Sequence, residues 1–161
     1  MTNSEMLISQ LQDFTSFLLS LRSIGDQEWN TPIGEGKWSV PDIIAHIMAW
    51  DKNFLDIVIP KLQRGEPVIL EEDTDVQGFN NRAVEYGKTL NQEQLIGKAV
   101  FYRSQIVTQL KKLPEDAFLT AGSGTNSFTL SSFLRNMFIS HDTHHKKQIE
   151  EHLSRHRRVK D

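Results

Sequence analysis

Hydrophobic residues recur at steps of three and four positions along most of the chain, and no segment sustains an alternation of apolar and polar residues. The first such segment covers about residues 4–21, and the second begins after Ser39 and is expected to end at Pro60 and Gly65. Further segments cover about residues 76–88, 92–113 and 130–153. Residues at these spacings share one helix face, so the pattern predicts amphipathic helices and an all-α fold.

Polar stretches containing glycine or proline separate these segments, at about residues 23–37, 65–75 and 121–126. The last of them lacks the Gly-Lys-Ser/Thr ending of a phosphate-binding loop, so it is interpreted as a turn. Residues 76–88 and 92–113 form either two helices or one broken helix. Four principal helices with long connections indicate a four-helix bundle with crossover loops.

Length and composition narrow the function classes. The chain has 161 residues, a normal size for one domain, so we expect a single domain over residues 1–161. There is no cysteine, which excludes disulfides and thiolate ligands, and the net charge of −3 gives no reason to expect a nucleic-acid partner. With no secretory signal and no apolar run of membrane-spanning length, we expect a soluble cytoplasmic protein without a membrane partner.

Three histidines are the strongest candidates for functional residues. His141 and His145 stand four residues apart and therefore share a helix face. The apolar stripe before them places His141 near its centre and His145 on its flank; its members are Leu130, Phe133, Leu134, Met137 and Phe138. His46 lies on the core side of the second helix, so helix packing could bring it opposite the pair.

Three imidazoles with an open fourth position are typical of a catalytic zinc site, and the same set suits nickel, iron or cobalt. The alternative interpretation is a set of core histidines satisfied by hydrogen bonds. His144 competes with His145 as the second ligand of the last helix, because i and i+3 residues also share a face. Asp51 and Asp142 are near the histidines in sequence but rotated away on their helices, so neither is assigned as a general base and the catalytic residues stay unassigned.

Several further residues have both a functional and a structural interpretation. Gln148 is either a hydrogen-bond partner of a ligand or a polar packing residue. Trp38 and Trp50 either line a substrate pocket or pack in the core. Four further side chains either contact a charged substrate or belong to the solvated surface of a helix: Asn80, Asn81, Arg82 and Tyr102.

The segment from Gly36 to Trp50, with Trp38-Ser39 and His46, and the late motif His141-x-x-x-His145-x-x-Gln148-Ile149 resemble the DinB/YfiT superfamily of metal-dependent enzymes. The resemblance implies a four-helix bundle of up-down-down-up order. It also implies a divalent metal held by His46, His141 and His145, with His144 outside the set. Lys146-Lys147 departs from the frequent arginine-glycine pair of the family, a change that affects the surface more than the ligands.

The resemblance also implies a range of functions. The leading hypothesis is a metal-dependent transferase or hydrolase that moves a low-molecular-weight thiol to an electrophilic small molecule, or hydrolyses one. Zinc or nickel is expected first, then iron, cobalt or manganese, and no other cofactor. The alternatives are a non-enzymatic stress-related binding protein and a dimerisation module with a structural or vestigial metal site. Related domains commonly dimerise, so we expect a homodimer.

Overall fold

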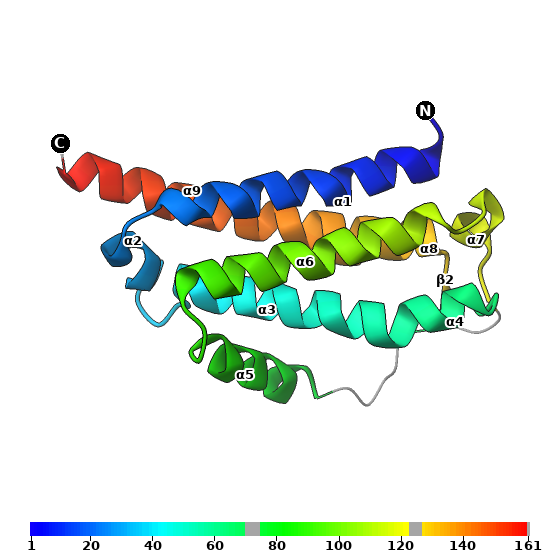
Figure 1. The fold of residues 1–161 in the computed structure, drawn as a ribbon, viewed down its shortest axis with the longest axis horizontal. Coiled ribbons are helices and arrows are strands. Elements are labelled where there is room, and N and C mark those ends of the chain that lie inside the picture. The colour runs from blue at the N-terminus through cyan, green and yellow to red at the C-terminus, as the bar shows by residue number, and fades with distance from the viewer. Residues whose placement is uncertain (70–74, 123–126, 161) are drawn as a thin grey trace.

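The computed structural model describes residues 1–69, 75–122 and 127–160. Its long helices are α1 (Asn3–Ser20), α3 (Val40–Asn53), α6 (Gln92–Lys111) and α9 (Ser140–Lys160), which pack side by side (Figure 1). In Figure 1, α1 and α9 run in one direction, whereas α3 and α6 run in the other. The predicted all-α bundle of up-down-down-up order is therefore confirmed.

Both helices that carry the candidate histidines contain a π turn. Helix α3 continues through the π segment η2 (Phe54–Val58) into α4 (Ile59–Gln63), and α8 (Leu130–Phe133) leads through η3 (Leu134–Ile139) into α9. The prediction that Pro60 ends the second helix was wrong. Pro60 lies in the first turn of α4, where proline is tolerated, directly after the π turn. The helix ends near Gly65, whose φ of +80° only glycine adopts readily.

Several short elements lie between the long helices, within or next to the stretches predicted as loops. They are η1 (Leu21–Ser23), α2 (Asp26–Asn30), α7 (Glu115–Leu119), and a two-residue antiparallel ladder of β1 (Val68–Ile69) with β2 (Ser127–Phe128). Burial explains α2 and α7, since Trp29 and Phe118 are among the core residues. A ladder of two residues is too short to produce an alternating pattern. Residues 70–74 and 123–126 of the predicted loops lie outside the described part of the chain.

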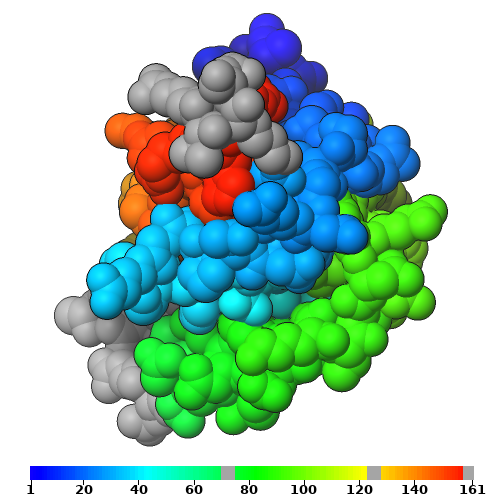
Figure 2. All heavy atoms as spheres, turned by 90° about the vertical axis from the view of Figure 1, so that its left-hand side faces the viewer, coloured from blue at the N-terminus to red at the C-terminus, as the bar shows by residue number. Residues whose placement is uncertain are grey.

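The crossover from α3 to α6 contains α5 (Val76–Gly87), a helix of its own rather than the first half of a broken one. It packs on α3 outside the main bundle, and Figure 2 shows its residues (green) below the start of α3 (cyan) at one end of the molecule. Gly87 permits this approach, because a Cβ there would lie 2.6 Å from the Cβ of Ala45. Residues of α5 are thereby brought next to His46.

The core has an apolar cluster toward each end of the bundle, and every long helix contributes to at least one of them. Along α3, α6 and α9 the two clusters are separated by polar side chains, which include Asp51, Arg103 and Asp142. On α9 the histidines His141 and His145 flank Asp142, and on α3 His46 lies five residues before Asp51. No helix within the described residues is long and apolar enough to cross a membrane.

Candidate metal centre

His46, His141 and His145 come together in one cluster between α3 and α9. The Nε2 atom of His141 lies 3.0 Å from Nε2 of His46 and 3.0 Å from Nε2 of His145. One ligand atom from each ring falls within 4.8 Å of the other two. Nitrogen ligands of a tetrahedral zinc, at about 2.0–2.1 Å from the ion, are roughly 3.3 Å apart, which is close to the two 3.0 Å separations measured from His141.

The exposure of the two α9 histidines is the reverse of what the sequence predicted. His145 is 8% exposed, whereas His141 is only partly buried, and Met137 of the predicted stripe is 49% exposed. The cause is η3, because a π turn holds an extra residue and shifts the buried face of every later turn. Both imidazoles nevertheless reach the cluster, since i and i+4 residues still share a face.

Hydrogen bonds fix the tautomer of His46. Trp50 Nε1 donates to Asn80 Oδ1 at 2.8 Å, and an indole nitrogen can only donate, so this amide atom is the oxygen. His46 Nδ1 lies 2.9 Å from the same oxygen and must therefore carry a proton. A neutral imidazole has one N–H group, so Nε2 of His46 presents a bare lone pair to the cluster.

Gln148 plays the corresponding part for His145. Its Oε1 atom accepts from Nδ1 of His145 at 2.8 Å, so Nε2 of His145 also presents a lone pair. The hydrogen-bonding interpretation of Gln148 is thus the one that the structure favours. The sequence predicted Asn80 either to meet a charged substrate or to belong to solvated helix surface, and neither is correct, because it binds His46 and Trp50.

The two bare nitrogens both face Nε2 of His141, and this atom can offer at most one proton. At least one of the two 3.0 Å contacts therefore has no hydrogen to share, and lone pairs oppose each other. A cation at the centre of the three Nε2 atoms removes the conflict. The donor set thus fits a divalent metal that accepts imidazole ligands.

Burial keeps the three rings neutral. It lowers the pKa of His46 to about 4 and that of His141 to about 3, with a smaller contribution from the neighbouring histidines. The pKa of His145 is also lowered, first by burial, and the hydrogen bond to Gln148 opposes this effect. Only a neutral imidazole binds a metal, so the environment favours the binding-competent form.

The remaining sequence candidates lie around the cluster rather than in it. His144 is exposed, although its ring centroid is 5.1 Å from that of His145. The ring of Trp38 lies 5.1 Å from that of His46, and Trp50 packs on Phe79 at 4.1 Å. Both tryptophans therefore belong to the aromatic surroundings of the site. Asn81, by contrast, is exposed and accepts a hydrogen bond from Gln77.

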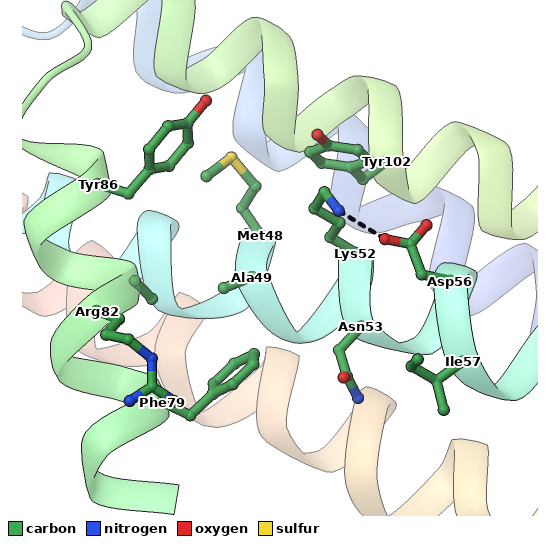
Figure 3. A pocket seen from close by; sticks show the side chains of 11 residues that line it. Met48, Ala49, Lys52, Asn53, Asp56, Ile57, Phe79, Arg82, Tyr86 and Tyr102 are labelled. Atoms are coloured by element: carbon green, nitrogen blue, oxygen red, sulfur yellow. Dashed lines mark hydrogen bonds and ion pairs between the residues drawn. The ribbon is translucent and has the colours of Figure 1, made fainter.

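A pocket of about 350 Å³ lies between α3, α5 and α6 (Figure 3). Ala49 and Asn53 of its lining follow His46 at three and seven residues, so they continue the helix face that carries His46. Much of the lining is apolar or aromatic, with an ion pair between Lys52 and Asp56 at 2.6 Å. The other lining residues are Met48, Ile57, Phe79, Arg82, Ala83, Tyr86 and Tyr102.

A buried ion network that the sequence analysis did not identify lies beside the histidines. Arg103 is fully buried and forms salt bridges with Asp51 at 2.8 Å and with Asp142 at 2.7 Å. Burial raises the pKa of Asp51 to about 6 and also raises that of Asp142, in both cases against the effect of Arg103. Burial alone would lower the pKa of Arg103, but the two carboxylates outweigh this effect and raise the pKa above its ordinary value. Both acids are engaged by Arg103, which agrees with leaving them unassigned as general bases.

Comparison with known proteins identifies the family. The sequence model of the DinB superfamily matches residues 10–149. The chain belongs to this superfamily. No curated protein matches its sequence significantly.

Two solved structures share the fold. One is YfiT from Bacillus subtilis, described as a probable metal-dependent hydrolase with an unusual four-helix bundle topology. It is 18% identical with a TM-score of 0.75, over 94% of this chain and 86% of that one. The other is a mycothiol-dependent maleylpyruvate isomerase, 19% identical with a TM-score of 0.67, over 91% of this chain. This chain spans 60% of the isomerase, so that protein contains a further part without a counterpart here.

Replacing Asn80 by alanine should weaken metal binding by roughly 10- to 100-fold, the usual effect of removing the partner that orients a ligand ring. The change removes the acceptor of both His46 and Trp50. Competition with a chelator of known affinity measures the loss. Asn81→Ala is the matched control, since it removes the neighbouring exposed amide. Equal affinities of the two variants would show that Asn80 does not orient His46.

The lowered histidine pKa values predict acid sensitivity of the metal-free protein. As pH falls from about 6.5 to about 4, these histidines accept protons in the unfolded chain before they do so in the folded one, so they reduce stability. The raised pKa of Asp51 acts in the opposite direction, which makes a comparison between variants necessary. His141→Gln should therefore lose less stability than wild type as the pH falls through this window, whereas His144→Gln should lose as much as wild type. Denaturant midpoints at several pH values measure this, and parallel pH profiles for wild type and His141→Gln would contradict it.

Proposed function

We propose that the chain is a metal-dependent enzyme in which His46, His141 and His145 hold one divalent ion, zinc or nickel first. The observation that carries this proposal is the proton count: two bare Nε2 atoms face a third nitrogen that cannot donate to both. Hydrogen bonds alone leave this arrangement unsatisfied, whereas a metal satisfies all three rings. Membership of the DinB superfamily supports the same conclusion.

We further propose that the substrate is a low-molecular-weight thiol, transferred to an electrophilic small molecule. A divalent ion with three imidazole ligands retains open coordination positions, at which it lowers the pKa of a bound thiol or water. A thiol is the more acidic of the two, with an unperturbed pKa of about 8.5 against about 15.7 for bulk water, so it depends less on a base to lose its proton. Asp142, which directly follows His141, and Asp51, five residues after His46, are both bound to Arg103. The site therefore suits a nucleophile that ionises without help.

The chain's own residues then have defined parts. Asn80 and Gln148 orient two of the rings through their Nδ1 atoms. Trp38 packs beside the ring of His46, and Trp50, which packs on Phe79, donates to the same Asn80 oxygen that binds His46. The pocket along the same face of α3 is of a size that accepts the organic part of a small substrate, and its lining reaches the site through Phe79, next to Asn80, rather than through the histidines themselves. Hydrolysis is the alternative reaction at the same site, and the expected homodimer stays a prediction.

The test uses the purified, untagged protein. Elemental analysis should find about one divalent metal per chain, and the loaded protein should accelerate reaction of cysteine with monochlorobimane. Stripping with a chelator should abolish turnover while the helical circular dichroism persists, because the apolar core does not depend on the ion. Loss of helicity would indicate a structural metal. Turnover that survives stripping would remove the metal from the reaction, and turnover of 4-nitrophenyl acetate alone would favour hydrolysis.

A further inference from the structure

Arg103 connects all the long helices of the bundle at one point. It belongs to α6, and its guanidinium donates to Asp51 of α3 from Nε at 2.8 Å and from Nη2 at 3.1 Å. It donates to Asp142 of α9 from Nη1 at 2.7 Å and from Nη2 at 3.0 Å, and from Nη1 to the Leu11 carbonyl of α1 at 3.3 Å. A guanidinium has five N–H groups, so every donor of Arg103 has an acceptor.

The two carboxylates belong to the helix segments that carry the histidines. Asp142 directly follows His141 and precedes His145 by three residues, and Asp51 follows His46 by five. Each carboxylate binds the planar guanidinium through two oxygens, which fixes its orientation as well as its distance. Helices α3 and α9 are consequently held in one relative position and rotation, beside the place where their imidazoles meet.

The same network carries a net negative charge. Two carboxylates share one guanidinium, so the group totals −1 when all three are ionised, and it is almost fully shielded from solvent. The adjacent imidazoles are neutral ligands and contribute no charge to balance a divalent ion. Charge interactions are stronger in a buried region than in water, so an uncompensated carboxylate beside the cluster, where Asp142 directly follows His141, favours a cation among the histidines.

We propose that the network of Asp51, Arg103 and Asp142 positions the histidines and sets the affinity of the site for a divalent cation. The inference rests on the proposed metal function and assigns no reacting role to the three residues. Arg103 affects the metal site by fixing the helices that it joins. The carboxylates affect it in two ways, by fixing the same helices and by their negative charge.

The test measures Co²⁺ affinity and the visible absorption of bound Co²⁺, which reports ligand geometry. Asp51→Asn keeps the side-chain shape but removes one charge, and it should weaken Co²⁺ binding by about tenfold or more. Asp56→Asn is the matched control, because it makes the same change at an exposed site nearby on the same continuous helix. Arg103→Lys keeps the charge but cannot bridge two carboxylates in the same way, so it should alter the absorption as well as the affinity.

Each outcome has a distinct meaning. Circular dichroism first establishes that the variants are folded, and Asp142→Asn provides a second carboxylate variant if Arg103→Lys does not fold. Folded Asp51→Asn and Asp142→Asn proteins with wild-type Co²⁺ affinity would overturn the inference while leaving the metal site intact. A wild-type protein that binds no Co²⁺ would instead overturn the proposed metal function on which the inference rests.

Discussion

Replacing His46 or His145 by alanine should abolish stoichiometric binding of a divalent metal, whereas His144→Ala should retain it. Each of the first two changes removes one of three Nε2 atoms that meet at the cluster. Loss of a ligand should exceed the roughly 10- to 100-fold cost of losing a partner that only orients one. Metal content after gel filtration, determined by elemental analysis, measures the effect.

His144→Ala is the matched control, because it removes a neighbouring imidazole that is exposed and lies outside the cluster. It also decides between His144 and His145, which helical spacing alone leaves open. Equal loss of metal from all three variants would reject this ligand set. Full retention by His46→Ala would show that α3 takes no part in binding.

Replacing Arg103 by methionine should destabilise the fold by about 3–5 kcal/mol, because it leaves two buried carboxylates without their partner. This is a large share of the roughly 5–15 kcal/mol that stabilises a typical domain. Denaturant unfolding followed by circular dichroism measures the change. Arg64→Met, which breaks the exposed pair with Glu66, should cost less than about 1 kcal/mol.

The triple variant Asp51→Asn/Arg103→Met/Asp142→Asn tests the reason for that loss. It removes all three charges together, so no buried ion is left unpaired, and it should recover part of the stability lost by Arg103→Met. A triple variant no more stable than Arg103→Met would show that packing, such as the contact of Arg103 with the Phe14 ring at 4.9 Å, is responsible.

Helical spacing and caps are local properties, so the sequence was sufficient to predict the long helices. Helix α3, for example, begins at Ser39 with Asp42 completing a capping box. Spacing only allowed His46 to meet His141 and His145, and it was the resemblance to the DinB/YfiT superfamily that implied their meeting. The exposure of His141 and His145 was predicted in reverse because a uniform period of 3.6 residues cannot anticipate a π turn such as η3. Asn80 was misjudged since only the tertiary packing of α5 on α3 places it beside His46.

The buried network was missed although a signal for it exists. Arg103 lies on an apolar stripe between Ala99 and Ile106, and Asp51 lies on one between Ile47 and Phe54. A charged residue on the apolar face of a helix must find an opposite charge in the core. Which helices meet at that level depends on the order of the bundle, so the sequence could suggest buried charges but could not pair them.

X-ray absorption of the zinc-loaded wild-type protein, with and without added cysteine, tests the central claim most directly. Three imidazole nitrogens should appear at about 2.0–2.1 Å from the ion, and the thiol should add one sulfur at about 2.3 Å. This result would place the ion on the three histidines with a position open to the proposed substrate. Fewer than three imidazoles, or a metal shell that cysteine leaves unchanged, would contradict the account.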